Sequence, residues 1–402
     1  MCRVINLSKI YFHIDVNNAF LSWEAIYRIQ KGEQIDIRNI ESAIAGDPKT
    51  RTGVILAKST KAKAMGVKTG EAIFQAKNKC PNLQLFPPHH DFYNKQSNKM
   101  KKILENYSDV IQQFSIDEFF IEYIPLLGTY YEVALDIQKN IFDKLGFTVN
   151  IGISDVKYLS KIASDFEKPN KIHTLFKNEI KEKLWPLNIE EMFLLGPQSA
   201  KKLKVIGINT IGKLANTNVE ILKKHLKSHG EELYNYAWGK DIQNNHSKDE
   251  TQKSIGHSMT STYDLTNKDE IYNFILNIVN DTCIRLRKQN AKAKNISVTI
   301  KTNNFEVYSG STTLDVYTNS TSEIFNICKN IFNNIYTNEP IRLIGVSLSE
   351  LNYNTSQLNM FEKINEKNSK IDKAVDSLLE KFNNNDLITR ASLLKSKQSD
   401  NS

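Results

Sequence analysis

Two adjacent carboxylates in an apolar run are the residues of this sequence best suited to chemistry. Asp117 and Glu118 lie within residues 113–123, whose other members are largely aromatic or branched aliphatic, as in a buried strand or hairpin. A buried carboxylate must be paired, protonated or bound to a cation, and a divalent metal is the usual partner. Because side chains alternate along a strand, both acids reach one site only if a turn or bulge separates them. A hairpin tip with two solvated acids is the alternative.

A third acid, Asp15, ends a second apolar stretch, residues 10–16, which we expect to form a strand. Residues 19–24 follow with helical character. Proteins hold a hard divalent cation with a few carboxylate oxygens and leave positions open for water or substrate phosphates. Three such acids therefore suit a two-metal phosphoryl-transfer site better than a structural calcium site.

Size and composition limit the classes of protein to consider. The chain has 402 residues, 40% of them hydrophobic, which is enough for about three domains. No apolar run approaches the roughly 20 residues of a membrane span, and the N-terminal residues lack a signal-peptide pattern. We therefore expect a cytoplasmic monomer without a membrane partner. The four cysteines are scattered and predict neither a zinc site nor a disulfide framework.

Positive charge is concentrated in three parts of the chain. The net charge of +8 is by itself only a weak pointer to a polyanionic partner. Each cluster alone would suit a solvated surface, but three clusters together with a metal site favour a phosphate backbone as partner. The clusters lie within residues 49–68, 201–227 and 285–294.

The order of the expected elements predicts two separate α+β sheets. With the small, basic and turn-rich region 30–86 set aside as an insertion, residues 10–153 read strand, helix, strand, helix, strand. This order suits a ferredoxin-like sheet with helices on one face, which can gather acids at one edge. Residues 254–350 then read strand, helix, strand, strand, helix, strand. The expected helices include residues 58–65, 71–79, 91–107, 130–145, 158–165, 269–288, 322–336 and 371–382.

Between the two sheets, residues 176–243 are expected to be helical and compact. Gly196 and Gly207 lie there in a stretch, 195–212, that resembles a helix-hairpin-helix. In that motif, backbone N–H groups at a turn and a helix N-terminus bind a DNA phosphate without regard to sequence. The usual turn has two glycines two residues apart, and here Leu194 occupies the first position.

Taken together, these motifs resemble the Y-family (DinB/UmuC-type) translesion DNA polymerases. The resemblance extends over about residues 8–361, in order and at compatible spacing. Its most specific parts are Asp15-Val16-Asn17 and Ser115-Ile116-Asp117-Glu118. The other parts are residues 19–20, 152–154, 160–165, 168–170, 195–212 and 342–346.

The resemblance implies a right-hand polymerase architecture. A ferredoxin-like palm would carry the acids, followed by small fingers, a helical thumb with the helix-hairpin-helix, and a tethered βαββαβ little-finger domain. The implied boundaries are 1–18 and 87–175 for the palm, 19–86 for the fingers, 176–243 for the thumb, 244–253 for a linker, 254–350 for the little finger and 351–402 for a tail.

The resemblance also implies roles for single residues in the palm. Phe20 falls where the family keeps an aromatic steric gate against the ribose 2′-hydroxyl, although an ordinary core aromatic is the plain alternative. Lys168 falls where the family has a lysine that binds the triphosphate. Two Mg²⁺ ions would be held by Asp15, Asp117, Glu118 and the carbonyl of Val16.

The fingers depart from the family pattern. The family usually shows a tyrosine and an arginine ahead of a Gly-Val pair, and this chain has Thr60 and Lys63 ahead of Gly66. Lysine still binds phosphate as a point charge but lacks the bidentate fork of arginine. We expect Thr60 and Lys63 to contact the nucleotide, with a weaker grip than in other family members.

Contacts with DNA and with a partner protein are implied outside the palm. Residues 357–361 resemble the bacterial sliding-clamp-binding peptide, anchored by Gln357, Leu358 and Phe361. The expected partners are primer-template DNA, dNTPs and the clamp. The residues expected to contact DNA are Gly196, Lys201, Lys202, Gly207, Arg285 and Arg287.

We therefore expect a bacterial, template-directed DNA polymerase of low fidelity that acts in translesion synthesis and DNA repair. Small fingers enclose the nascent base pair loosely, and fit alone discriminates weakly between substrates. The alternative from another class is a non-catalytic DNA-binding adaptor that docks on the clamp. A nucleotidyl cyclase on the same palm would need neither the helix-hairpin-helix nor the clamp peptide.

Overall fold

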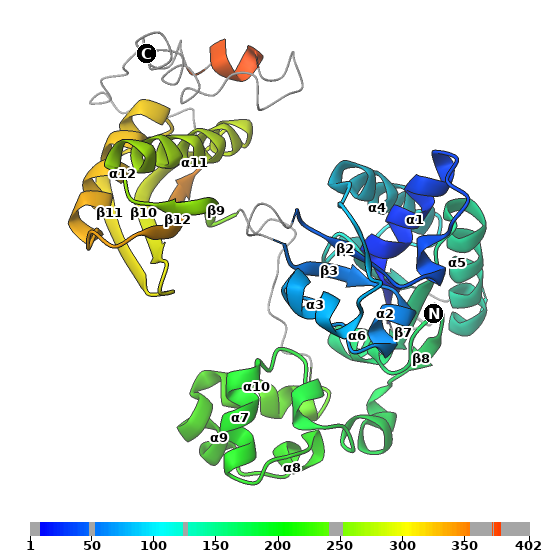
Figure 1. Cartoon of the computed structure of the whole chain (residues 1–402). Helices are drawn as coiled ribbons and strands as arrows, with labels where there is room; N and C mark the ends of the chain where they lie inside the picture. Colours follow the sequence, from blue (N-terminus) through cyan, green and yellow to red (C-terminus); the bar gives the residue numbers. More distant parts are fainter. Residues whose placement is uncertain are drawn as a thin grey trace, which may run out of the picture. The chain divides into compact units, whose positions relative to one another are not determined.

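The structure, a computed structural model, describes residues 9–47, 53–123, 128–240, 252–353, 372 and 374–378. These residues form two compact units, one within 9–240 and the other within 252–378 (Figure 1). The candidate clamp-binding peptide 357–361 and most of the predicted linker lie outside the described residues.

A five-stranded sheet lies at the centre of the first unit, with β1 in its middle. The strand order is β5-β6-β1-β7-β8, and β1 runs antiparallel to both β6 and β7. β-Branched and aromatic residues dominate these segments, which favours the strand conformation. The strands are β1 (Ile10–Val16), β5 (Ile111–Gln113), β6 (Glu118–Tyr123), β7 (Val149–Ser154) and β8 (Ile172–Thr174).

One face of this sheet is covered by three helices. Phe12, Ile14 and Val16 of β1 are buried in a core that these helices share with β6 and β7. The large side chains Trp23 and Tyr93 are completely buried in the same core. The helices are α1 (Ala19–Gln30), α4 (His90–Leu104) and α5 (Tyr130–Leu145).

The opposite face carries a fourth helix, α6 (Lys157–Asp165). The predicted element order assigned no face to this helix, which packs directly against β7. Gly152 of β7 is the physical reason, because a Cβ at this position would lie 1.9 Å from the carbonyl oxygen of Ser160. Only glycine lets the backbones of α6 and β7 come this close.

A small three-stranded sheet, with strand order β3-β2-β4, forms the next part of the first unit. The side-chain oxygen of Ser59 accepts a hydrogen bond from the Ala62 N–H at 3.1 Å and caps the following helix. Lys58 therefore belongs to β3, and the helix begins two residues later than predicted. The elements are β2 (Ser42–Ala45), β3 (Ile55–Lys58), α2 (Thr60–Ala64), α3 (Ile73–Lys79) and β4 (Gln84–Phe86).

The remainder of the first unit is helical, as predicted. Its apolar core includes Leu203, Ile211 and Leu222, and it continues into residues of α6. The hydroxyl of Tyr158 donates to the Tyr236 carbonyl at 2.5 Å and ties α6 to the last helix. The helices are α7 (Pro197–Val205), α8 (Ile211–Ala215), α9 (Val219–Leu226) and α10 (Ser228–Ala237).

The second unit contains the predicted strand and helix order around a four-stranded sheet, β11-β10-β12-β9. Alternate residues of β10, such as Ile296 and Val298, are buried in a core that the sheet shares with the two helices. No helix in the described part of the chain is long and apolar enough to cross a bilayer. The elements are β9 (Ser254–Leu265), α11 (Lys268–Lys288), β10 (Lys292–Thr302), β11 (Val307–Thr318), α12 (Thr321–Ile335) and β12 (Ile341–Asn352).

Candidate active site

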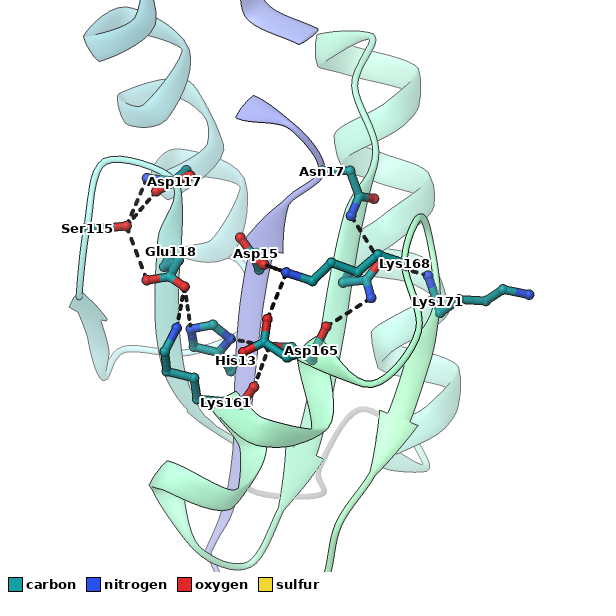
Figure 2. A network of polar contacts seen from close by, with 12 residues as sticks. His13, Asp15, Asn17, Ser115, Asp117, Glu118, Lys161, Asp165, Lys168 and Lys171 are labelled. Carbon is teal, nitrogen blue, oxygen red and sulfur yellow. Dashed lines mark hydrogen bonds and ion pairs between the residues drawn. The ribbon is translucent and has the colours of Figure 1, made fainter. Parts of the chain in front are cut away.

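The three predicted acids meet at one edge of the central sheet (Figure 2). Asp15 on β1 and Glu118 on β6 are partners in the antiparallel register. Asp117 lies in the turn just before β6, where its carbonyl oxygen accepts a hydrogen bond from the Val16 N–H at 3.1 Å. Residues 115–117 form a bend that ends just before Glu118, the first residue of β6. It brings Asp117 to the end of the strand that carries Asp15.

A serine organises the two acids of the turn. The Ser115 hydroxyl lies 2.6 Å from Oδ1 of Asp117 and 3.3 Å from Oε2 of Glu118. It can donate its proton to one of them at a time. This contact fixes the direction of both carboxylates without neutralising either charge.

Two lysines supply the positive charge at the site. Lys168 forms an ion pair with Asp15 and a second one with Asp165 at 2.8 Å. Lys161 on α6 forms an ion pair with Glu118 (Figure 2). The sequence motif assigned a role to Lys168 but none to Lys161, whose position depends on the packing of α6.

The pKa of Asp15 reflects this crowding of charges. Burial raises the pKa of Asp15 to about 6, and the neighbouring Glu118 and Asp117 carboxylates add to the rise, although Lys168 opposes it. Burial lowers the pKa of Lys168, but its carboxylate partners Asp15 and Asp165 outweigh this effect and raise the pKa above its usual value. Three carboxylates, Asp15, Asp117 and Glu118, thus face two ammonium groups, those of Lys161 and Lys168.

A buried histidine lies beneath Glu118. The Nδ1 atom of His13 lies 2.7 Å from the Ser164 hydroxyl, whereas its Nε2 atom has no hydrogen-bond partner and lies 3.9 Å from Oε1 of Glu118. Burial lowers the pKa of His13 well below its usual value, with Lys161 and Lys168 contributing. The ring is therefore neutral at physiological pH. No motif in the sequence indicated this residue.

A network of asparagines fixes the position of Lys168. The Asn17 side chain donates to Oδ1 of Asn150 at 3.0 Å and accepts from the Asn170 N–H at 2.8 Å. Asn150 in turn donates to the Ser164 and Glu167 carbonyls at 3.0 and 2.6 Å. The segment that carries Lys168 is thereby tied to β1 and β7. Asn150 was not predicted, because its role depends on contacts between distant segments.

The described residues contain no group of three His, Cys, Asp or Glu side chains already converged on one metal position. Each acid is instead turned toward its own partner, Lys168, Lys161 or Ser115. The donor set still fits Mg²⁺, because it consists of carboxylate oxygens at an open edge of the sheet. The orphaned Nε2 of His13, a buried polar atom, lies 3.9 Å from Oε1 of Glu118 in this donor set.

The predicted steric gate, Phe20, is held by aromatic neighbours. Its ring centroid lies 5.0 Å from that of Tyr93 and 6.3 Å from that of Trp23. The Tyr93 hydroxyl donates at 2.8 Å to Glu24, which is completely buried. Phe20 itself is only partly buried. It is therefore a rigid aromatic side chain with one exposed part, which fits both the gate and the core alternative.

The two predicted fingers residues are exposed at the start of α2. Thr60 and Lys63 have exposed side chains, and Lys63 lies near Lys58 of β3. Burial and the adjacent Lys63 ammonium lower the pKa of Lys58. The Asn18 side chain, just after β1, donates to the Lys58 carbonyl at 2.7 Å. Two close ammonium groups beside the acid-bearing strand are suited to an anion.

The predicted helix-hairpin-helix residues lie on the surface around α7. Gly196 immediately precedes α7, and Lys201 and Lys202 are exposed on it. Gly207 follows with a φ of 84°. Leu194, at the position of the usual first glycine, also has a positive φ, 62°, and an exposed side chain. The backbone therefore keeps the conformation that glycine favours, at a cost in strain.

The two arginines of the second unit that were predicted to contact DNA differ in exposure and in how fully they are paired. Arg285 is half exposed and pairs with Asp281 at 2.7 Å. Arg287 is nearly buried and bonded to Asp376 through two nitrogens, at 2.6 and 2.7 Å. Because its hydrogen-bonding groups are already used within the unit, we leave Arg287 out of the DNA interface.

Comparison with known proteins agrees with this geometry. The model of the impB/mucB/samB family matches residues 14–165, and that of its C-terminal domain matches residues 252–360. The solved structure of a chimera of the Y-family DNA polymerases Dbh and Dpo4 superposes with a TM-score of 0.72 at 23% identity, covering 85% of this chain and 98% of that chain. The chain belongs to the Y-family of DNA polymerases.

Within that family, the chain is similar to DNA polymerase IV of several bacteria. DNA polymerase IV of Clostridium acetobutylicum is 42% identical over 98% of this chain and 100% of its own length. DNA polymerase IV of Clostridium kluyveri is 34% identical over 97% of this chain and 99% of its own length. The chain is thus a DNA-directed DNA polymerase that is similar to the bacterial, DinB-type DNA polymerase IV.

Proposed function

We propose that this chain is a template-directed, low-fidelity polymerase that adds dNTPs to a primer 3′-end during translesion synthesis and repair in the bacterial cytoplasm. The observation that carries the proposal is the pairing of Asp15 with Glu118 across neighbouring strands, with Asp117 in the turn beside them. Acids from segments remote in sequence thus meet at one open edge of a sheet. No observation in the structure favours the adaptor alternative.

In this proposal two Mg²⁺ ions are held by Asp15, Asp117, Glu118 and the Val16 carbonyl. When bound, they supply Lewis-acid stabilisation of the attacking and leaving oxygens of a phosphoryl transfer. The protein contributes carboxylates of fixed direction, through Ser115, and a neutral His13 that adds no competing positive charge. Lys161 and Lys168 form ion pairs with Glu118 and Asp15.

The incoming nucleotide would be held from two sides. Lys168, which lies next to Asp15, would bind triphosphate oxygens. Lys63, with Thr60 as a hydrogen-bond donor, would bind the triphosphate from the fingers. Phe20 would exclude a ribose 2′-hydroxyl, and its contact with Tyr93 supports a fixed ring position.

Duplex DNA would be held by its phosphates. The N-terminus of α7 at Gly196, with the exposed Lys201 and Lys202, offers backbone N–H groups and positive charge. Gly207 and the half-exposed Arg285 remain candidates for further phosphate contacts. A sliding clamp would bind residues 357–361 through Gln357, Leu358 and Phe361, a proposal that rests on the sequence resemblance alone.

Primer extension with single dNTPs and Mg²⁺ tests the proposal. Asp117→Ala and Glu118→Ala should each lower the rate of incorporation by about 10³-fold or more while DNA binding in a gel-shift assay is retained. Asp109→Ala, which changes an exposed acid near the same hairpin, is the matched control and should remain active. Full activity of the Asp117 and Glu118 variants would instead support the adaptor.

A further inference from the structure

The end of the described chain is attached to the second unit by an ionic contact that the polymerase mechanism does not use. Asp372 and residues 374–378 are helical. Asp372 and Asp376 are four residues apart, so they share one face of this helix. Both side chains are directed at Arg287, in the last turn of α11.

Arg287 is the centre of this contact. Its Nε and Nη2 atoms donate to the two oxygens of Asp376 at 2.6 and 2.7 Å, a side-on bidentate geometry. Its Nη1 atom donates to the Asn319 carbonyl and the Thr321 hydroxyl, each at 3.0 Å. One guanidinium therefore joins α11, the start of α12 and the C-terminal segment.

Asp372 completes the contact at the start of α12. Only 3% of this residue is exposed, and its Oδ2 atom accepts from the Thr321 N–H at 3.2 Å. Ser320, which precedes α12, makes no capping bond with its own side chain. A carboxylate at a helix N-terminus stabilises the free N–H groups there. Asp372 thus supplies from a distant part of the chain the cap that Ser320 does not.

We propose that Asp372 and Asp376 form a latch that docks the C-terminal segment on Arg287 and the start of α12. The segment is then an integral part of the second unit and not a free tail. This inference is independent of the polymerase reaction, because every contact that carries it lies within the second unit.

Tyr353, the last described residue after β12, is anchored to the same unit, because its hydroxyl donates to the Gln252 carbonyl at 2.7 Å.

Hydrogen exchange of the full chain, followed by mass spectrometry, tests the latch. The first turn of α12, residues 319–323, should exchange about tenfold faster or more in Asp372→Ala/Asp376→Ala and in a chain that ends at residue 371, because charged hydrogen bonds are lost. Amides of β10 should keep their protection. Asp315→Ala, which removes an exposed acid of the same unit, is the control and should match the wild type.

Arg287→Lys provides an independent arm, because lysine keeps the charge and loses the bidentate fork. It should give an intermediate rate at residues 319–323. Loss of protection throughout the second unit, β10 included, would contradict a latch that acts at the start of α12. Wild-type exchange of residues 319–323 in the shortened chain, or equal acceleration by Asp315→Ala, would overturn it.

Discussion

At the scale of single residues, the site holds more negative charge than it can neutralise. Burial raises the pKa of Asp15, and the Glu118 and Asp117 carboxylates add to the rise, whereas two ammonium groups, from Lys161 and Lys168, face the three acids. Like charges in a partly buried site disfavour the folded state unless a cation binds. The acids required for the proposed reaction therefore make the metal-free fold less stable.

Asp15→Asn should stabilise the metal-free chain at neutral pH. The pKa of Asp15 is about 6 in the folded state against an ordinary value of 3.8, so the folded state binds the proton more tightly. Stability contributed by the protonated form is therefore lost as the pH rises from about 4 to 6. Above that range the variant should gain up to about 3 kcal/mol in free energy of unfolding.

Urea unfolding in EDTA, followed by tryptophan fluorescence, measures this effect, because Trp23, Trp185 and Trp238 all lie in the first unit. The difference between Asp15→Asn and the wild type should be largest near pH 8 and should shrink toward pH 4. Lys168 keeps Asp165 as a partner in the variant. A difference that does not change with pH would contradict the charge argument.

Phe20→Ala should weaken discrimination between deoxyribonucleotides and ribonucleotides. Removal of the ring that Tyr93 and Trp23 hold opens space beside the proposed sugar site. We expect the preference for the deoxy sugar, as a ratio of kcat/KM values, to fall by about tenfold to a hundredfold. Phe74→Ala, at an aromatic residue that is 66% exposed on α3, is the control. Unchanged sugar selection in Phe20→Ala would show that Phe20 is a core residue only.

At the scale of elements, the position of α6 determines where the residues that contact Glu118, His13 and Lys168 lie. This helix carries Lys161, Ser164 and Asp165, which contact Glu118, His13 and Lys168. Its close approach depends on Gly152 of β7, where even a methyl group would clash with the backbone of α6. The site therefore depends on one residue that makes no polar contact with it.

Gly152→Ala should be strongly destabilising. The added Cβ would lie 1.9 Å from the Ser160 carbonyl oxygen and 2.4 Å from the Ser164 nitrogen, so α6 must move. We expect a loss of about 3 kcal/mol or more in stability, together with loss of DNA synthesis. Gly196→Ala is the control for stability, since nothing lies within 4 Å of a Cβ there. Thermal unfolding of Gly152→Ala at the wild-type temperature would contradict the packing argument.

The sequence predicted the elements better than their packing. Residue types and periodicity located β1, β6 and the helix of residues 130–145, and the motif located the acids and Lys168. The face occupied by α6 could not be predicted, because it depends on a glycine and a helix packing together. His13, Asn150 and Lys161 were missed for the same reason, since their partners lie far away in the sequence.

At the scale of the whole molecule, charge patterning predicted a phosphate backbone as partner, and the structure shows that one of the predicted cations is already paired. The cluster at residues 285–294 suggested DNA binding, yet Arg287 is bonded to Asp376, 89 residues further along the chain. Composition cannot distinguish a free cation from one that the fold has already paired. The latch could therefore be inferred only from the structure. The division into separate sheets, in contrast, was predicted from the order of the elements.

The central claim is that Asp15, Asp117 and Glu118 together hold two metal ions. Its most direct test is the number of Mn²⁺ ions bound in a complex of the chain with primer-template DNA and a non-hydrolysable dNTP, counted by electron paramagnetic resonance. We predict two ions for the wild type and for Asp109→Asn, and fewer than two for Asp15→Asn/Glu118→Gln. The same number of ions in the double variant as in the wild type would contradict the claim.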